Sequence, residues 1–416
     1  DCIAGLAVAP GGSNQKEGVG AIMLDGIRIL DLTNVLAGPF CCHQLAHMGA
    51  EVIKVEAVGR GDLARHLGAD ENLNAHKMGI SFLAQNAGKK SLTLNLKSDA
   101  GKAVFFELLK TADVLVENFR PGVMARLGLD YETLKPDYPE LIFCAISGFG
   151  QTGPFSDRPA YDQIVQGLSG VMRITGKSED EPFRVGYPLA DTIGGLTAAM
   201  AISAALNNQP RGQFIDVSML DSVLTTMGWV VSNYLIGDVA PAPHGNENIT
   251  SAPSGTFQTA KGLLNIAANE EKQWKALIAV LGCMEIADDN RFYNRDNRKQ
   301  NRAVLKETLE VYLAQKPASE WERALNAVGV PAGAVMTVSE ILDHDHIQHR
   351  GLLARFDKGG SMRREINVMR TGFQIDGEPA SVATPPPELG AHTKEILMAL
   401  GYDDTRIERL KQEGVI

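Results

Sequence analysis

The 416-residue chain has few cysteines, and none of them form a paired motif. The five cysteines lie at positions 2, 41, 42, 144 and 283, so no Cys-x-x-Cys spacing occurs. An odd number at irregular spacing argues against a disulfide framework and fits reduced thiols in a cytosol-like compartment. We therefore expect the cysteines to be packing residues and the protein to be cytoplasmic, or in the mitochondrial matrix if its source is eukaryotic.

Long apolar runs and an excess of positive charge are also missing. The apolar run from Gly195 to Leu206 is well short of the about 20 residues that a bilayer requires. Acidic residues number 50 against 40 lysines and arginines, for a formal net charge of −10. Because Lys and Arg would have to neutralise phosphates, this balance argues against nucleic acid or a membrane as the main partner.

The start of the chain carries no basic segment of the kind that opens a signal peptide. Residues 1–22, which contain the run Gly-Gly-Ser-Asn-Gln, are predicted to be a flexible tail. The remaining length, with 44% hydrophobic residues overall, is enough for two or three domains with a sizeable core.

Short apolar strands alternate with helices in the first 150 residues. Helices are predicted at 40–48 and 98–110, and strands at 27–32, 51–56, 89–96, 114–119 and 141–146. Further along the chain, helices are predicted at 161–174 and 219–235. Repeated strand–helix–strand units predict an α/β fold with a parallel sheet. The turn at 59–62 would lie at the carboxyl edge of that sheet, where open α/β folds bind ligands.

Composition then changes, and the change predicts the domain plan. Residues 236–254 are rich in proline and indicate a linker, whereas 255–334 combine a hairpin with helices. From 335 to 416 the chain is expected to return to the first domain, whose N-terminal part is 23–235. The prediction is thus a large domain built from both chain ends and a smaller inserted α+β domain.

Two motifs suggest functions that their contexts exclude. Residues 148–153 match Gly-x-Gly-x-x-Gly, but Pro154 and Pro159 block the helix that a dinucleotide site needs. The tract His344 to His349 resembles a metal site, yet on a helix its side chains would fan around the axis. We predict a turn-rich loop for the first, a solvated helix end for the second, and no metal.

Asp191 is the main catalytic candidate. It stands as a single carboxylate between an extended approach and a helix of small residues predicted at 192–207. Aspartate in that place is most often an N-cap, whose side chain accepts hydrogen bonds from backbone N–H groups. A helix N-terminus also favours a carboxylate that stays ionised and is able to attack an electrophile. The two roles are compatible, and we propose the catalytic one.

Many separate blocks occur in the order found in one family. They include Val-Glu-Asn-Phe-Arg-Pro-Gly at 116–122, Gly-Ala-Glu-Val-Ile-Lys-Val-Glu at 49–56, and the segments 31–39, 59–62, 86–96, 127–129, 147–154, 212–217 and 387–393. Together they resemble the class III CoA-transferases, the formyl-CoA and carnitine CoA-transferase family. The resemblance spans nearly all of residues 25–416.

The resemblance implies a fold, a substrate and a mechanism. The fold would be a Rossmann-like large domain with an inserted smaller domain, in a homodimer whose two ring-shaped chains interlock. The family's catalytic aspartate falls on Asp191, which would carry a covalent aspartyl intermediate. A coenzyme A thioester would be a substrate rather than a tightly bound cofactor, and the second substrate would be a carboxylic acid.

The resemblance also places the CoA. Matching positions are Leu36, Ala37, Asn118, Phe119 and Arg126. From their charge we add Arg60 and Lys90 as phosphate partners. Near Arg60 the sequence departs from the family's pattern, since Ala57 and Val58 stand where the formyl-CoA enzyme carries basic residues.

Further residues are predicted to contact the acyl substrates. Tyr161 and Asp162 align with the family's pocket, and Gly245 is a candidate oxyanion donor. A second carboxylate on the substrate would need an arginine fork, for which Arg173 and Arg184 are the candidates. The sequence at 34–41 and 233–237 resembles the branch that uses succinyl-CoA and dicarboxylic acids more closely than the formyl-CoA or carnitine branches.

Other functions stay open at this point. The 2-methylacyl-CoA racemases share the fold but place a histidine base where this chain has Tyr161, whose unperturbed pKa near 10 suits it badly. A non-catalytic CoA-binding protein is another alternative. An oxidoreductase using residues 148–153 is the third, and nicotinamide titration would test it.

Overall fold

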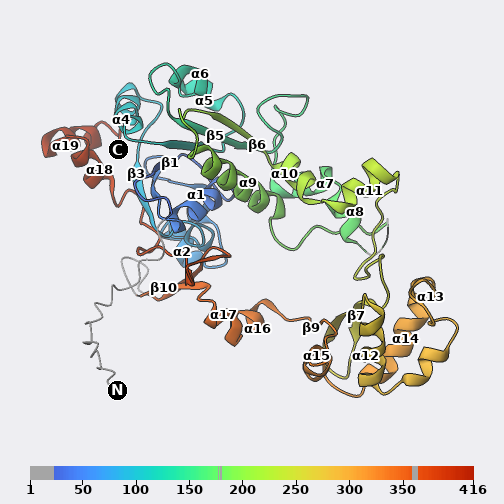
Figure 1. Ribbon diagram of the computed structural model, residues 1–416. Coiled ribbons are helices and arrows are strands. Elements are labelled where there is room, and N and C mark those ends of the chain that lie inside the picture. The colour runs from blue at the N-terminus through green and yellow to red at the C-terminus, as the bar shows by residue number, and fades with distance from the viewer. Residues whose placement is uncertain (1–22, 177, 179, 358–363) are drawn as a thin grey trace, which may run out of the picture. The chain divides into compact units, whose positions relative to one another are not determined.

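The computed structural model describes residues 23–176, 178, 180–357 and 364–416 (Figure 1). Contacts divide the chain into two compact units. Of the described residues, those up to Ala160 together with those in Ala190–Ser222 and Arg350–Ile416 make up unit 1, and those in Tyr161–Leu189 and Val223–His349 make up unit 2. The domain boundaries expected at 235, 254 and 334 stay predictions. The predicted tail lies outside the described residues.

Unit 1 is built on a six-stranded parallel sheet in the order β3-β2-β1-β4-β5-β6. The strands are β1 (Arg28–Asp31), β2 (Glu51–Glu56), β3 (Lys89–Thr93), β4 (Val114–Glu117), β5 (Ile142–Ser147) and β6 (Phe214–Ser218). The predicted α/β class and parallel sheet are confirmed. This order is that of doubly wound folds, in which the crevice beside the two central strands receives ligands.

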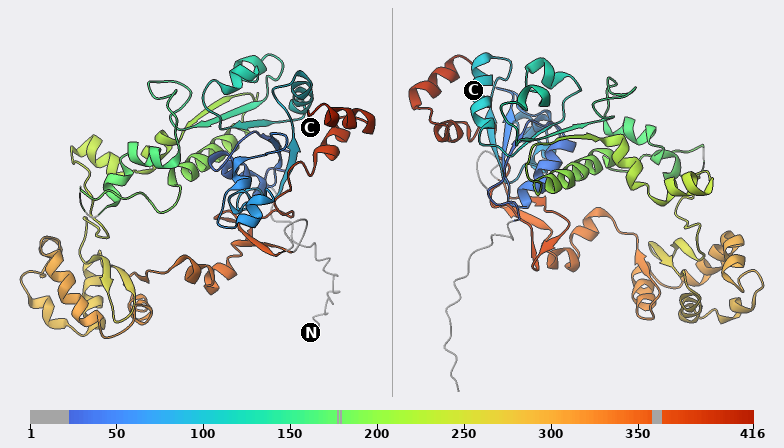
Figure 2. Two further views of the ribbon diagram at one scale, coloured as in Figure 1. Left: turned by 180° about the vertical axis from the view of Figure 1, so that it is seen from behind. Right: turned by 45° about the horizontal axis from the view of Figure 1, so that its top comes forward.

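Helices cover the central strands of the sheet, so that every residue of β5 is buried, whereas the edge strand β6 is partly exposed. One large core joins α4 (Asp99–Leu109) to the sheet and to two C-terminal helices, α18 (Thr393–Ala399) and α19 (Asp404–Gln412). Figure 2 shows these C-terminal helices beside the blue and cyan N-terminal elements. Another helix, α1 (Ala37–His47), lies against β1, β2 and β4.

A second core in unit 1 also joins distant parts of the chain. It packs α2 (Glu71–Ala75) and α3 (Ile80–Leu83) against the hairpin of β10 (Leu353–Phe356) and β11 (Ile366–Met369). Further elements of this unit are η1 (Leu63–His66), α5 (Val123–Leu127), α6 (Tyr131–Leu134), α9 (Leu189–Ala205), α10 (Met219–Thr226), β12 (Gln374–Ile375) and β13 (Glu378–Pro379), α9 and α10 each extending past its boundary.

Unit 2 contains a three-stranded antiparallel sheet, β7 (Ser254–Gln258), β8 (Leu263–Ala267) and β9 (Ala332–Ala334). The hairpin predicted about Lys261 and Gly262 is present. Trp274 and Trp321 are buried between the sheet and its helices. The helices of this unit are α7 (Asp162–Leu168), α8 (Val171–Thr175), α11 (Trp229–Gly237), α12 (Glu271–Leu281), η2 (Met284–Asp288), α13 (Arg295–Gln300), α14 (Arg302–Leu313), α15 (Ala318–Asn326), α16 (Val338–Leu342) and α17 (Asp345–His349).

Two predicted helices are broken by glycines that adopt a positive φ. The helix expected over 161–174 is α7 and α8, separated at Gly170 with φ 82°. The helix expected over 219–235 is α10 and α11, separated at Gly228 with φ 44°. A left-handed conformation cannot continue a right-handed helix, so each glycine ends one.

Two other expectations bear on membranes and thiols. None of the helices in the described part of the chain is long and apolar enough to cross a bilayer. Cys41, Cys42, Cys144 and Cys283 are buried and unpaired with one another, as the packing prediction requires. The cytoplasmic location remains a prediction.

Candidate active site

A cavity of about 540 Å³ opens at the carboxyl edge of the parallel sheet in unit 1. Segments that follow β1, β2, β3 and β4 all contribute to it, so it lies across the point where strand order reverses. Its walls are Leu32, Thr33, Asn34, Val55, Glu56, Ala57, Val58, Arg60, Gly61, Leu94, Asn95, Leu96, Lys97, Phe119, Val123 and Leu127. The lining thus combines apolar side chains such as Leu32 and Phe119 with one acid, Glu56, and with two exposed basic side chains, Arg60 and Lys97.

Hydrogen bonds fix the two central walls relative to each other. The backbone N–H of Asn34 donates to Asn118 Oδ1 at 2.8 Å, and Asn118 Nδ2 donates to the Asn34 carbonyl at 2.8 Å. This pair ties the end of β4 to the loop after β1. The same loop leads to the predicted residues Leu36, at the N-cap position of α1, and Ala37, its first residue. Phe119 follows Asn118 directly and lines the cavity.

Beneath the cavity lies a network of buried charges. Lys54 Nζ lies 3.0 Å from Asp62 Oδ2 and 3.7 Å from Asp31 Oδ1, and Lys89 Nζ lies 2.9 Å from Asp31 Oδ2. Asp62 also accepts the Val35 N–H at 2.9 Å. The four charged side chains are fully buried, so the loops at 33–35 and 60–62 rest on a rigid base.

The pKa values in this network follow from burial and pairing. Burial alone would raise the pKa of Asp31, but Lys54 and Lys89 outweigh it and lower the pKa to about 2. Burial would lower the pKa of Lys54, and Asp31 and Asp62 instead hold it above its usual value. Asp31 and Lys54 therefore stay ionised near neutral pH and act as structural charges.

The other predicted CoA partners differ in their surroundings. Arg60 is exposed at the rim of the cavity, and Arg126 is exposed on α5, whose Val123 and Leu127 line the cavity. Lys90 lies near the amino end of β3, away from the carboxyl edge, and pairs with Glu51 at 3.1 Å and Glu395 at 2.8 Å. The structure does not bring Lys90 to the cavity.

Asp191 is half-buried in the first turn of α9. The helix already begins at Leu189, two residues earlier than the carboxylate, so Asp191 does not occupy the N-cap position and that interpretation was wrong. A first-turn carboxylate is still favoured by the N–H groups and dipole of the helix.

Glycines let α9 approach α1 closely. A Cβ added at Gly195 would lie 2.6 Å from the Ala37 carbonyl oxygen and 3.3 Å from the Cys41 nitrogen. Only a residue without a side chain fits there. Because Gly195 is one turn after Asp191, the contact brings the helix that carries Asp191 onto the start of α1, three residues beyond the cavity residue Asn34.

The remaining predicted residues belong to unit 2. Tyr161, at the N-cap position of α7, is 71% exposed. Asp162 is buried and accepts a hydrogen bond from Gln166 Nε2 at 2.7 Å. Arg173 on α8 and Arg184 in the segment before α9 are exposed.

Gln166 organises the approach to α9. Its amide donates to the Tyr187 carbonyl at 3.2 Å and its Oε1 accepts the Val185 N–H at 2.9 Å. The segment that carries Arg184 is thereby held to α7. Gly245, with φ 56°, donates its N–H to the Gly176 carbonyl at 3.2 Å, so that N–H is already engaged in a protein hydrogen bond.

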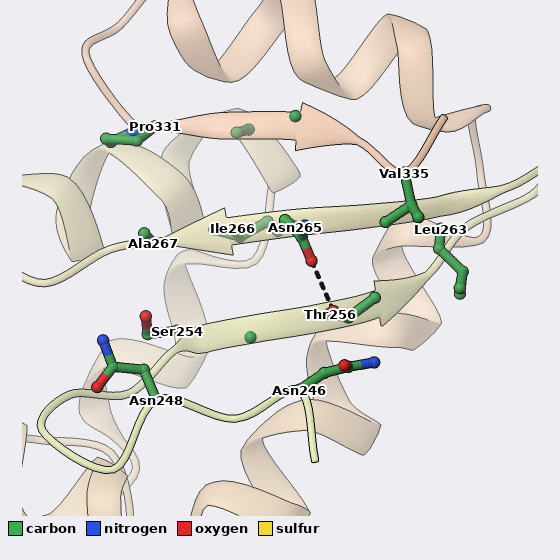
Figure 3. Close-up of a pocket in the computed structure, with 13 residues that line it drawn as sticks. Asn246, Asn248, Ser254, Thr256, Leu263, Asn265, Ile266, Ala267, Pro331 and Val335 are labelled. Atoms are coloured by element: carbon green, nitrogen blue, oxygen red, sulfur yellow. Dashed lines mark hydrogen bonds between the residues drawn. The ribbon is translucent and has the colours of Figure 1, made fainter. Parts of the chain in front are cut away.

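A second cavity, of about 610 Å³, lies on the sheet of unit 2 (Figure 3). Figure 3 shows the Thr256 hydroxyl bonded to Asn265, one strand away. The lining residues are Asn246, Asn248, Ser254, Gly255, Thr256, Leu263, Asn265, Ile266, Ala267, Pro331, Ala332, Gly333 and Val335. All of these are uncharged, and none is a predicted site residue, although Gly245 directly precedes Asn246.

No group of three or more potential metal ligands is found among the described residues. The histidine tract forms α17, as a helical interpretation predicts. Residues 148–153 follow the fifth strand of the chain, and the next helix begins only at Asp162. Neither feature of the dinucleotide motif, a first-strand position or a following helix, is therefore present.

Comparison with known proteins identifies the family. The model of CoA-transferase family III matches residues 24–393. Succinyl-CoA:glutarate CoA-transferase of Mus musculus is 36% identical over 94% of this chain and 90% of its own length. Succinate–glutarate CoA-transferase of Agrobacterium fabrum is 37% identical over 91% of this chain and 95% of its own. The chain belongs to CoA-transferase family III and is an enzyme of that class.

A solved structure agrees with this membership. A CaiB/BaiF family protein from Brucella suis superposes with a TM-score of 0.81 at 32% identity, covering 91% of this chain and 100% of that one. The likeness extends over both units, so it accounts for the inserted sheet as well as the parallel one.

Sequence reasoning missed three residues that shape the site. Lys97 is the second cation of the first cavity, Asn34 is the partner of Asn118, and Gln166 holds the segment before α9. Lys97 follows directly after β3 and its apolar extension, so the carboxyl-edge rule applied to that strand would have indicated it. The roles of Asn34 and Gln166 depend on hydrogen bonds to residues distant in the sequence, so only the folded structure reveals them.

Proposed function

We propose that this enzyme transfers CoA from succinyl-CoA, or a closely related acyl-CoA, to a free dicarboxylic acid, with Asp191 as the nucleophile. The names of the relatives support the substrate class, since two of them join succinate or succinyl-CoA to glutarate. The single observation that carries the role of Asp191 is its place in the first turn of α9, which packs onto α1 beside the loop of the carboxyl-edge cavity.

The cavity suits the nucleotide part of CoA. Leu32, Val55 and Phe119 offer apolar surface to a base, and the exposed Arg60 and Lys97 at the rim are placed to pair with phosphates. The switch point of a doubly wound sheet is where such nucleotides bind in this architecture. Leu36, Ala37 and Asn118 would then hold the loop that leads from this cavity toward α9.

The proposed chemistry balances without a proton transfer. A carboxylate oxygen of Asp191 attacks the donor thioester carbonyl and the C–S bond breaks. CoA thiolate is released, and an aspartyl-acyl anhydride remains. The thiolate attacks the Asp191 carbonyl and releases the donor acid, which leaves an aspartyl-CoA thioester. The acceptor carboxylate then displaces CoA thiolate, and the thiolate attacks the acceptor carbonyl of the second anhydride to free Asp191.

This route is covalent catalysis that divides one acyl exchange into easier steps. The first turn of α9 supports it because backbone N–H groups there favour the ionised carboxylate. A carboxylate nucleophile needs no general base, so no Ser-His or Cys-His pair is required.

Arg173 and Arg184 are the proposed partners of the distal carboxylate of a dicarboxylic acid. Both guanidinium groups are exposed, and Arg184 lies only seven residues before Asp191, in the segment that Gln166 holds. An Arg184→Ala enzyme should lose activity with a dicarboxylic acceptor about tenfold more than with a monocarboxylic acceptor of equal length. Equal losses would remove Arg184 from this role.

A homodimer, interlocked as in the resembling family, is proposed as the working assembly. The exposed apolar side chains of α11 support a partner surface, since Trp229, Leu235 and Ile236 are 85%, 72% and 86% exposed in the single chain. Light scattering on the purified protein would measure twice the mass of one chain, and a monomer mass would contradict the proposal.

The test of the mechanism is chemical trapping of the activated carboxyl. The protein is incubated with succinyl-CoA, quenched with hydroxylamine, digested and mapped by mass spectrometry. A hydroxamate on Asp191 that requires the acyl-CoA is expected, and Asp191→Asn should lose both the label and more than about 100-fold of the activity.

Asp221→Asn is the matched control, because Asp221 is likewise a first-turn carboxylate, on α10 after β6. It should keep both the activity and the label on Asp191. If no donor in a panel of acyl-CoAs labels Asp191, the covalent mechanism is wrong. Deuterium exchange at the α-carbon of a 2-methylacyl-CoA would then identify a racemase.

A further inference from the structure

Two acidic side chains, the buried Glu117 and the exposed Asp216, share one row of the parallel sheet. Glu117, the last residue of β4, pairs in register with Ala145 of β5, which pairs in turn with Asp216 of β6. Residues paired in register point to the same face of a sheet. Glu117 is 4% exposed. The two carboxyl groups therefore flank the small Ala145 methyl group on one face.

Each carboxyl group holds one loop of the carboxyl edge. Glu117 Oε2 accepts the Phe119 N–H at 2.7 Å, and Asp216 Oδ2 accepts the Gln151 N–H at 2.9 Å. Phe119 lines the carboxyl-edge cavity, and Asn118 beside it binds the Asn34 loop. Glu117 thus fixes the turn from which Phe119 lines the cavity and Asn118 binds the Asn34 loop.

The surroundings of Glu117 favour its neutral form. Within the part of the chain that the structure describes, no lysine or arginine forms an ion pair with it. Burial is the largest cause of a raised pKa for Glu117, which reaches about 8. The Phe119 N–H lowers this pKa, and the charge of Asp216 raises it further. Cys144 on β5 also lies nearby, and burial holds the pKa of its thiol well above the usual value, so it adds no charge.

We propose that Glu117 is a positioning residue for CoA: its protonated carboxyl keeps the turn through Phe119 in the shape that receives the nucleotide, and loss of that proton weakens CoA binding. The proposal rests on the assignment of the cavity to CoA. An ionised Glu117 is repelled by Asp216 and needs water, which favours rearrangement of the turn. It also places negative charge behind a wall that faces the phosphates of CoA.

Linkage gives the proposal a second consequence. If the proton favours CoA binding, CoA binding must equally favour the proton. Near pH 8, where Glu117 is partly ionised, binding should therefore draw protons from the buffer. Glutamine at this position keeps the shape of the neutral acid but has nothing to titrate, so Glu117→Gln should bind CoA without that uptake.

The experiment is calorimetric titration of the full-length protein with acetyl-CoA from pH 6.5 to 9.5, in pairs of buffers that differ in ionisation enthalpy. The wild-type affinity should fall about tenfold across pH 8, a coupling of ordinary size. Glu117→Gln should give a flat profile after the same ligand titration is subtracted. Asp216→Asn removes one cause of the raised pKa of Glu117, so its CoA affinity should fall at a lower pH than that of the wild type.

Steady-state kinetics separates positioning from a general structural role. The KM for the acyl-CoA should follow the pH dependence of binding, while kcat at saturating acyl-CoA stays within about twofold in Glu117→Gln. A pH-independent wild-type affinity overturns the proposal, and so does a Glu117→Gln profile that matches the wild type. If that variant fails to fold, the wild-type proton uptake and the Asp216→Asn shift still decide.

Failure of this proposal is distinguishable from failure of the proposed function. Hydroxylamine trapping at saturating succinyl-CoA tests Asp191 alone. A labelled Asp191 together with a pH-independent affinity rejects Glu117 and leaves the transferase mechanism. A pH-dependent affinity lost in Glu117→Gln, without any label on Asp191, supports Glu117 and rejects the covalent mechanism.

Discussion

Asn118 and Asn34 exchange two hydrogen bonds of 2.8 Å between the side-chain amide of one and the backbone of the other. They stand after β4 and β1, the adjacent strands at which the order of the sheet reverses. A side-chain amide carries an acceptor oxygen and a donor nitrogen side by side, so Asn118 binds both the N–H and the carbonyl of Asn34. The pair therefore holds closed the base of the crevice that the fold opens at this point.

Replacing Asn118 with alanine should widen that crevice. The Asn34 N–H and carbonyl would lose their partners, a loss of about 1–3 kcal/mol for a group that stays buried. We expect the KM for the acyl-CoA to rise about tenfold, with a smaller change in kcat, in steady-state assays. Asn207→Ala is the control, since the exposed Asn207 bonds only within its own helix end. Equal KM values in the two variants would contradict this role of Asn118.

Lys89 and Lys90 are neighbours on β3 with opposite environments. Lys89 is fully buried against Asp31, whereas Lys90 is partly exposed between Glu51 and Glu395. Lys89→Met leaves a buried carboxylate with one cation fewer and should cost about 3–5 kcal/mol of unfolding free energy. Lys90→Met should cost about 1 kcal/mol or less. Urea denaturation of both variants measures the difference, and similar losses would contradict the buried network.

Arg60 and Lys97 should act on CoA through their charge. Either substitution to alanine is expected to raise the KM for the acyl-CoA about tenfold, because each removes a charge-assisted bond to phosphate. The salt dependence of KM should weaken as well, since exposed charge pairs are screened. Lys90→Ala is the control and should leave KM unchanged. A larger effect at Lys90 than at Lys97 would restore the original assignment of Lys90.

Much of unit 1 could be predicted from the sequence because its signals are local. Continuous apolar strands such as Leu141 to Ile146, separated by helices, are typical of parallel strands, and the six-stranded sheet follows. The polar turn at 59–62, which follows the second strand, marked one wall of the cavity, and Arg60 lines it. These inferences need only the direction of the chain in each strand.

The sequence-based predictions that failed concern features set by a single backbone conformation or by a residue distant in the sequence. Gly228 ends a helix because its φ is 44°, and nothing in an apolar run from Met219 to Leu235 specifies that value. Lys90 was chosen for its charge, but its role is set by Glu395, 305 residues away. Charge alone cannot tell a ligand contact from an ion pair, so such positions need the folded structure.

Glu117 should make stability depend on pH. Its pKa is raised from 4.5 to about 8 in the folded protein. Between these values the folded state holds a proton that the unfolded state has lost, so the contribution is present in full below pH 4.5 and is lost as pH rises to 8. Glu117→Gln, which cannot ionise, should therefore gain melting temperature relative to the wild type as pH rises.

Calorimetry at pH 5 and pH 8.5 measures this gain. At pH 5 the two proteins should melt within about 2 °C of each other, and at pH 8.5 the variant should melt several degrees higher, since about 1 kcal/mol moves the Tm of a large domain by 2–4 °C. Glu132→Gln, an exposed acid on α6, serves as the control and should show no such trend. A constant difference between the proteins would mean that Glu117 is already ionised in the fold.

The adjacent glycines 194 and 195 of α9 provide the sharpest test of how Asp191 is placed. Alanine favours a helix interior over glycine by about 1 kcal/mol at either position, so propensity does not distinguish them. The new methyl at Gly195 would lie 2.6 Å from the backbone carbonyl of Ala37, which cannot yield without moving α1. At Gly194 the nearest atom is Met219 Cγ at 2.9 Å, part of a flexible side chain.

Gly195→Ala should therefore shift the first turn of α9 away from α1 and lower kcat about 10- to 100-fold, because an ångström of misplacement is costly in catalysis. Gly194→Ala should keep most of the activity. Hydroxylamine trapping on both variants reports directly on Asp191: the label should fall in the Gly195 variant in step with kcat. Full labelling and full activity there would mean that close packing of α9 on α1 does not position the nucleophile.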